Sequence, residues 1–299
     1  MHSRTGTLAV IVVVSLAALA AGLVISNRTG KPGFESDSIV TTINGFDGPE
    51  AVRYDPDQDV WFVSNFGGDA SGDSNGFVSK VSADGVILER EFMIGSEDFP
   101  FHGGRGMYIE GAVLWVADAE GIHEFDRFTG SQLGFVDLSA FEPGFPNDIV
   151  VTATGDMYVT DTDASRLYKI SDGVASIAAE TPFPANGITI NPANGRLILV
   201  PWSDSVEFVE WDVDSLEFST LGMAPTGGSF DGVEVVNGRI ITASQADKSL
   251  HIMVDGIDRL AVELPGRPAD IGLDTRRMHI AVPYVGRDQV DIVVLESLF

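Results

Sequence analysis

Short apolar segments recur along the chain, and most of them occur in pairs. Each first segment of a pair follows one polar residue, and these residues are, in chain order, Glu50, Arg105, Asn147, Asn186, Asp231 and Asp270. Each second segment follows closely, at 60–64, 113–117, 156–160, 196–200, 239–243 and 278–282. The segments are too short for helices and are rich in β-branched and aromatic residues, so the pattern predicts paired β-strands.

The pairs repeat with a period of about forty residues, which is typical of the blades of a β-propeller. Six units predict an all-β, six-bladed β-propeller over residues 38–299, with four strands in each blade. Because the first strand of a blade lines the central channel, the six polar residues should converge there. A further strand at 38–43 should pair with the last unit, near 290–295, and close the ring without open edges.

The chain before the repeats has a different character. An uncharged apolar run extends from Leu8 to Ile25, with Arg4 before it and Arg28 and Lys31 after it. This arrangement predicts that residues 1–25 form a signal peptide or a membrane anchor, and the two alternatives stay open. Residues 26–37 are polar and contain Gly and Pro, as in a linker. We therefore expect the propeller to be exported, to the periplasm, the extracellular space or the outer side of a membrane.

The charge of the chain limits its partners. It contains 44 acidic and 18 basic residues, for a net charge of −26. Such a surface should repel nucleic acid and anionic lipid, so we expect neither as a partner, and contact with a membrane only through an uncleaved N-terminal segment. The chain has no cysteine, which excludes disulfides, thiolate nucleophiles and Cys-bound zinc.

Motifs of several enzyme classes are missing. The sequence contains no G-x-S-x-G, P-loop or H-E-x-x-H motif. The stretch from Asp55 to Asp59 resembles the start of an EF-hand loop, but Val60 stands where that loop needs glycine and Phe66 where it needs glutamate. Its position between two predicted strands indicates a turn.

The polar residues that open four of the units form the strongest candidate site. Glu50, Asn147, Asn186 and Asp231 combine two carboxylates with two amides, a mixture of oxygen ligands that suits a hard cation such as Ca²⁺ or another divalent ion. The alternative for each Asn is an ordinary turn residue. Asp148, and Arg105 with His102, are expected near the same end of the channel.

The motifs around these residues resemble those of the gluconolactonase/regucalcin (SMP-30-like) propellers, a superfamily that also contains paraoxonases and strictosidine synthase-like proteins. The segments that carry the resemblance are 48–52, 146–149, 186–188 and 231–233. The resemblance implies a calcium ion at the floor of the channel, held by Glu50, Asn186 and Asp231. It makes Asn147 either a further ligand or a substrate contact. It also implies lactone hydrolysis in which calcium polarises the carbonyl and Asp231 or a histidine activates water.

Two positions depart from the family pattern. Sugar lactonases of the family carry arginine two residues before the asparagine that Asn147 matches, whereas this chain has Phe145, which makes the entrance more apolar. Paraoxonase-like enzymes place a histidine at the start of the second blade, whereas this chain has Arg105 there and His102 on the preceding loop. We therefore expect catalytic roles for Asp231 and His102, and substrate contacts from Asn147, Asp148, Arg105 and Phe145.

Three functions follow as hypotheses. The first is an exported, calcium-dependent hydrolase of a lactone or related ester that acts on a small molecule. The second is a non-catalytic, calcium-stabilised propeller that binds a partner or small ligand. The third is a lyase or condensing enzyme of the strictosidine synthase kind, which requires a catalytic channel glutamate that the strand pattern does not place. The fold alone does not choose among them.

Overall fold

The computed structural model describes residues 38–68, 72–204 and 207–295. The predicted signal or anchor segment, residues 1–25, and the predicted linker, residues 26–37, lie outside the described residues. Within the described ranges, no helix has the length and apolar character needed to cross a membrane.

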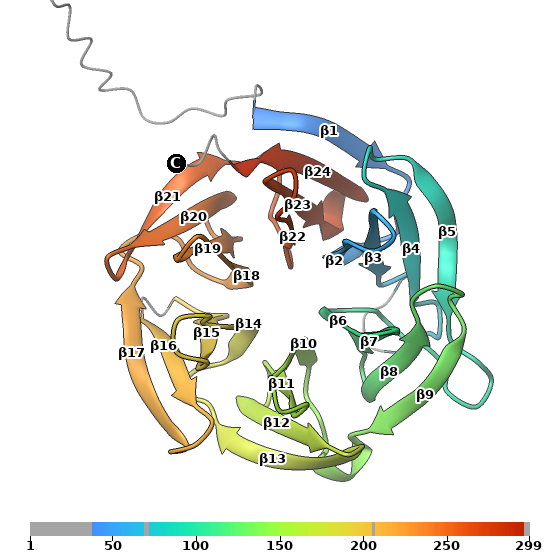
Figure 1. Ribbon diagram of the computed structural model, residues 1–299, viewed down its shortest axis with the longest axis horizontal. Helices are drawn as coiled ribbons and strands as arrows, with labels where there is room; N and C mark the ends of the chain where they lie inside the picture. Colours follow the sequence, from blue (N-terminus) through green and yellow to red (C-terminus); the bar gives the residue numbers. More distant parts are fainter. Residues whose placement is uncertain (1–37, 69–71, 205–206, 296–299) are drawn as a thin grey trace, which may run out of the picture. The chain divides into compact units, whose positions relative to one another are not determined.

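The regular structure of the described chain is almost entirely β-strand, arranged as sheets around a central axis (Figure 1). The innermost strands are β2 (Pro49–Asp55), β6 (Met107–Glu110), β10 (Pro146–Val151), β14 (Ala185–Ile190), β18 (Phe230–Val236) and β22 (Gly272–Asp274). Each pairs with a second strand: β3 (Val60–Asn65), β7 (Val113–Ala117), β11 (Met157–Asp161), β15 (Leu197–Pro201), β19 (Arg239–Ser244) and β23 (His279–Tyr284). The paired apolar segments of the sequence are therefore the two inner strands of each set of four strands.

Two further strands complete each group. The third strands are β4 (Phe77–Ser82), β8 (Gly121–Asp126), β12 (Arg166–Ser171), β16 (Glu207–Asp212), β20 (Ser249–Val254) and β24 (Gln289–Val294). The outer strands are β5 (Ile87–Ile94), β9 (Gln132–Asp137), β13 (Val174–Glu180), β17 (Glu217–Met223), β21 (Ile257–Glu263) and β1 (Ile39–Asn44). Together they give a propeller-like fold.

The two ends of the fold meet in one sheet. β1 pairs antiparallel with β24, from Ile39 opposite Val293 to Asn44 opposite Gln289, and the sheet order is β1-β24-β23-β22. The predicted pairing of the early strand with the last unit is therefore confirmed. Four sheets have four strands, and a fifth has eight because Met223 of β17 pairs in parallel with Ile257 of β21.

The core lies between neighbouring sheets. One cluster brings Phe62 and Val78 of the β2–β5 sheet against Met107, Leu114 and Phe125 of the next sheet. Such contacts bury the apolar face of each sheet, so every sheet depends on both neighbours for its stability.

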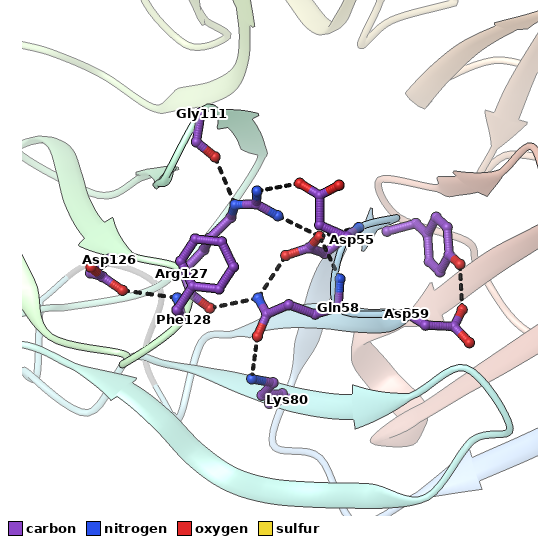
Figure 2. Close-up of polar contacts among 10 residues, drawn as sticks. Asp55, Gln58, Asp59, Lys80, Gly111, Asp126, Arg127 and Phe128 are labelled. Carbon is purple, nitrogen blue, oxygen red and sulfur yellow. Dashed lines mark hydrogen bonds and ion pairs between the residues drawn. The ribbon is translucent and has the colours of Figure 1, made fainter.

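The stretch that resembles an EF-hand loop is a turn between β2 and β3, as predicted. The Asp55 carboxylate accepts hydrogen bonds from the backbone N–H groups of Asp57 and Gln58, which fixes the turn. The same carboxylate receives the guanidinium of Arg127 from the neighbouring sheet, and Arg127 Nε also donates to Gly111 O at 2.7 Å (Figure 2). This polar cluster therefore ties the first two sheets together.

Arg127 to Ala should destabilise the fold strongly. Asp55 is fully buried, and removing the cation would leave its carboxylate without a counter-charge. Breaking a buried pair in this way costs about 3 kcal/mol or more in the free energy of unfolding. Urea denaturation would measure the loss, with Arg196→Ala as the control, because Arg196 forms a partly exposed pair with Asp212 and should cost less than about 1 kcal/mol. Equal losses in the two variants would contradict this role of Arg127.

Candidate functional site

β-bulges place four polar side chains at the channel. The pairing register shifts between Pro49 and Ala51, between Pro146 and Ile149, between Ala185 and Ile188, and between Phe230 and Val233. The residues inside these shifts include Glu50, Asn147, Asn186 and Asp231. A bulge bends its strand and redirects a side chain, so the same local irregularity positions each of the four.

Glycines allow the inner strands to approach one another at this level. A Cβ on Gly187 would lie 2.1 Å from the backbone oxygen of Asp231, and a Cβ on Gly232 would lie 2.4 Å from the backbone nitrogen of Ile271. Neither distance leaves room for a side chain. The glycine after Asn186 and the glycine after Asp231 therefore let each inner strand lie against the next one.

The four side chains line one cavity of about 350 Å³. Its other lining residues are Phe66, Phe145, Thr162, Asp163, Trp202, Gln245, Ala269 and Val285. Glu50, Asn147, Asn186 and Asp231 are each less than 5% exposed, so they lie deep in the site. The aromatic side chains make most of the remaining wall apolar.

One oxygen of each of the four residues has no hydrogen-bond partner. These oxygens are Glu50 Oε2, Asn147 Oδ1, Asn186 Oδ1 and Asp231 Oδ1. Neighbours orient two of them: Asn147 Nδ2 donates to Thr162 Oγ1 at 3.1 Å, and Gln245 Nε2 donates to Asp231 Oδ2 at 2.9 Å. A buried oxygen without a partner costs about 1–3 kcal/mol, so four of them in one cavity require water or a ligand there to satisfy them.

The carboxylates are poorly stabilised as anions. Burial raises the pKa of Asp231 to about 8, and the charge of Asp148 adds to the shift. Burial, followed by the charge of Asp231, raises the pKa of Glu50 well above its usual value, although Arg105 opposes the shift. A bound cation would reverse both effects, because it favours the ionised form.

This oxygen set fits a hard divalent cation. Calcium accepts carboxylate and amide oxygens together in flexible geometry. Across residues 38–68, 72–204 and 207–295, no three Asp, Glu or His side chains are grouped so that they could hold a metal by themselves. A metal in this cavity would therefore rely on the two amide oxygens as well as on Glu50 and Asp231.

Arg105 and Phe145 act as a unit at the wall of the cavity. Phe145 lines the cavity, and the Arg105 guanidinium carbon lies 3.6 Å from the centre of its ring. Arg105 is buried, donates to Pro146 O at 2.8 Å and is not a lining residue. The structure therefore places Arg105 behind Phe145, where it supports the ring, and does not support the predicted contact with substrate.

Asp148 and His102 are also outside the cavity lining. The Asp148 carboxylate accepts from the backbone N–H groups of Ile188 and Ile149, so it joins two inner strands. The His102 ring contacts Ser74 Oγ, in the loop between β3 and β4, at 3.3 Å. These positions do not support the predicted substrate contact of Asp148 or the predicted role of His102 as a base.

Several lining residues escaped the sequence analysis, although they share a position. Phe66, Thr162, Trp202, Gln245 and Val285 each follow the last residue of a second strand. In an antiparallel pair the end of the second strand lies beside the start of the first. The position directly after a second strand could therefore have identified these five lining residues in the sequence.

Comparisons with known proteins agree with the fold. No family model matches the sequence, and no curated protein matches it either. Among solved structures, a putative gluconolactonase is similar with a TM-score of 0.65 and 15% identity, over 88% of this chain and 94% of that one. A gluconolactonase from Xanthomonas campestris has a TM-score of 0.64 and 14% identity, over 89% and 95%.

A virginiamycin B lyase from Staphylococcus aureus is also similar, with a TM-score of 0.57 and 13% identity, over 85% of this chain and 98% of that one. At these identities the likeness concerns the fold. The chain thus shares the fold of gluconolactonase structures, as its motifs indicated.

Proposed function

We propose that this protein is a calcium-dependent hydrolase of a lactone or related ester. The observation that carries the proposal is the set of four unpartnered oxygens, from Glu50, Asn147, Asn186 and Asp231, in one buried cavity. Its fold is that of structures named gluconolactonases, which supports hydrolysis of a cyclic ester as the reaction class.

The residues of the cavity would have different roles in the reaction. A calcium ion on the four oxygens would polarise the ester carbonyl and stabilise the negative charge that develops on its oxygen. Gln245 holds Oδ2 of Asp231, so the carboxylate is oriented, and we assign Asp231 the further role of accepting the proton of the attacking water. Asn147, held by Thr162 Oγ1, would provide one of these four oxygens. Phe66, Phe145 and Trp202 would enclose an apolar part of the substrate and exclude bulk water.

The proposal also covers the number of blades and the cellular location of the protein. We count β14–β17 and β18–β21 as separate blades, because the single pairing between Met223 and Ile257 is all that joins them into one sheet. This count gives a six-bladed propeller. We also propose export, through the apolar run from Leu8 to Ile25, either as a cleaved signal or as an anchor.

An activity screen tests the reaction. Purified protein should hydrolyse some member of a panel of lactones and aryl esters, and a chelator should abolish the turnover until calcium is restored. Product masses separate hydrolysis, which adds water, from elimination, which does not, and two of the similar structures are lyases. His102→Gln should retain activity within about twofold, because its ring lies outside the cavity lining. A large loss in that variant would restore the histidine as a candidate base.

The alternative is a non-catalytic propeller in which calcium is structural and the cavity holds a small ligand or a segment of a partner. The apolar wall of Phe66, Phe145 and Trp202 favours it, since such a wall binds many ligands without chemistry. Calcium binding together with no turnover on the whole panel would favour this alternative.

Stabilisation by calcium should depend on pH in a defined direction. Without metal, the pKa of Asp231 is about 8 in the folded protein, against about 4 in an unfolded chain. The folded state binds the extra proton, so the metal-free protein loses stability as the pH rises from about 4 to about 8. Calcium needs the ionised carboxylates, so at about 5 mM it should raise Tm by several degrees more at pH 8 than at pH 5.

Differential scanning fluorimetry with chelated protein measures this effect. Magnesium at the same concentration controls for general binding of cations to the acidic surface. An equal calcium shift at both pH values would contradict the assignment of the site to Glu50 and Asp231.

A further inference from the structure

A second cavity, of about 450 Å³, has an unusual charge for this chain. Its lining residues are Gln245, Lys248, Pro265, Gly266, Arg267, Tyr284, Val285, Gly286 and Arg287. Three of the 18 basic residues of the chain are therefore gathered here, and none of the described carboxylates lines the cavity. In a chain with a net charge of −26, this is a local reversal of sign.

The three cations of this basic cavity are available to a ligand. Lys248 and Arg267 are exposed, and within the described residues neither forms an ion pair. Arg287 makes long contacts, 3.4 Å each, to Pro265 O and Gln289 Oε1, both uncharged. Other guanidinium groups at sheet ends pair with carboxylates, as Arg127 does with Asp55 and Arg277 with Asp59.

The basic cavity adjoins the candidate metal site. Gln245 and Val285 line both cavities. Gln245 also donates to Asp231 Oδ2 at 2.9 Å, so one side chain contacts the proposed metal ligand and faces the basic cavity. The turn between β19 and β20, which carries Gln245 and Lys248, thus connects the reaction centre with the cations.

We propose that this basic cavity is the subsite for an oxyanion group of the substrate, a carboxylate or a phosphate. This inference deepens the proposed function, because it assigns an anionic ester or lactone as the substrate class. The reacting carbonyl lies at the metal site, and the anionic group lies across Gln245 and Val285, against Lys248, Arg267 and Arg287. Unpaired guanidinium groups suit this task, since they bind carboxylates and phosphates through charge-assisted hydrogen bonds. The acidic remainder of the surface would disfavour an anion elsewhere.

Kinetics on a matched pair of substrates test the subsite. The pair is γ-butyrolactone and its ring-carboxylated analogue, assayed with the calcium-loaded protein and with Lys248→Gln/Arg267→Gln. The parent should prefer the carboxylated lactone, and the double variant should lose about tenfold or more in kcat/KM for it, the cost of lost charge-assisted contacts. Its kcat/KM for γ-butyrolactone should stay within about twofold. Equal losses on both lactones, or no loss on either, would overturn the proposal.

A binding measurement separates failure of the subsite from failure of the proposed hydrolysis. Glutarate and inorganic phosphate are titrated into the full chain at low and high salt, with ligand-observed NMR as the readout. Binding of either one that weakens about tenfold in Lys248→Gln/Arg267→Gln supports the subsite even if neither lactone is hydrolysed, and the tighter ligand identifies the class of anion. Binding that is absent, or equal in parent and variant, overturns it.

Arg276→Gln is the matched control for both experiments. Arg276 is exposed and follows β22, at the other end of β23 from Arg287, and its replacement removes one positive charge, against two in the double variant. It should leave kcat/KM on both lactones and the binding of both anions within about twofold of the parent. Unfolding temperatures of all variants verify the fold.

Discussion

Asp231→Ala should lower the affinity of the protein for calcium about a hundredfold or more, and should abolish calcium-dependent turnover. Asp231 provides one of the two carboxylates among the four unpartnered oxygens, and its burial leaves no other anion to replace it at that position. The loss of a charged interaction in a buried site is on the order of 3 kcal/mol, and each 1.4 kcal/mol is a factor of ten in affinity. Calorimetry on chelator-treated protein gives the affinity.

Without metal, Asp231→Ala should not lower the stability of the protein. The pKa of Asp231 is about 8, so its ionised form is unfavourable in the metal-free fold at pH 8. Removing it should leave the metal-free Tm equal to that of the parent or higher. Asp163→Asn is the control, because this carboxylate lies at the exposed edge of the same cavity and should change calcium affinity less than about threefold. A lower metal-free Tm in Asp231→Ala, with calcium affinity intact, would remove Asp231 from the site.

Arg53→Met should destabilise the fold by about 3–5 kcal/mol, since it removes the cation from a buried group of carboxylates. Arg53 Nη1 lies 2.6 Å from Glu234 Oε1, and its Nη2 lies 3.6 Å from Asp270 Oδ2 and 4.0 Å from Asp148 Oδ1. These residues come from β2, β18 and β10 and from the segment just before β22, so one guanidinium joins four parts of the channel wall. Chemical denaturation would show the loss.

The double variant Arg53→Met/Glu234→Leu tests the cause. If the unpaired charge is responsible, the second substitution should recover part of the loss, so that the effects are not additive. Burial already raises the pKa of Glu234 and of Asp270. The loss in Arg53→Met should therefore be smaller at pH 5 than at pH 8, since these carboxylates can then take up protons. Additive losses that do not change with pH would point to packing by the arginine stem instead.

Much of the site could be predicted because its residues occupy one repeated position. Glu50, Asn147, Asn186 and Asp231 all open first strands, and the period of the apolar segments was enough to align them. The local geometry obeys the same rule, since all four lie in bulges of their strands. The pairing of β1 with β24 was predictable for a similar reason, because one strand was left over before the first unit and the last unit lacked one strand.

The rest of the site depends on contacts that no local pattern encodes. Arg105 occupies the equivalent position in the second unit. Its long side chain points toward Phe145 and Pro146 of the next sheet and does not line the cavity. Asp148 follows Asn147 at a position where three other units have glycine, and its carboxylate accepts a hydrogen bond from the backbone N–H of Ile188. His102 lies on a loop between sheets, whose path the strand pattern does not determine.

The cations of the basic cavity illustrate the same limit. Lys248, Arg267 and Arg287 come from three separate connections, so nothing in the sequence marks them as neighbours. Their meeting follows from the antiparallel order of the strands in two consecutive units, which places the turn after β19, the connection after β21 and the turn after β23 at the same end of the sheets.

Diffraction from crystals grown with calcium, recorded with anomalous signal, tests the central claim most directly. We expect one strong peak in the cavity that these four residues line, at about 2.3–2.6 Å from Glu50 Oε2, Asn147 Oδ1, Asn186 Oδ1 and Asp231 Oδ1. A cavity that holds only water hydrogen-bonded to these oxygens, with calcium absent or confined to the acidic surface, would contradict it.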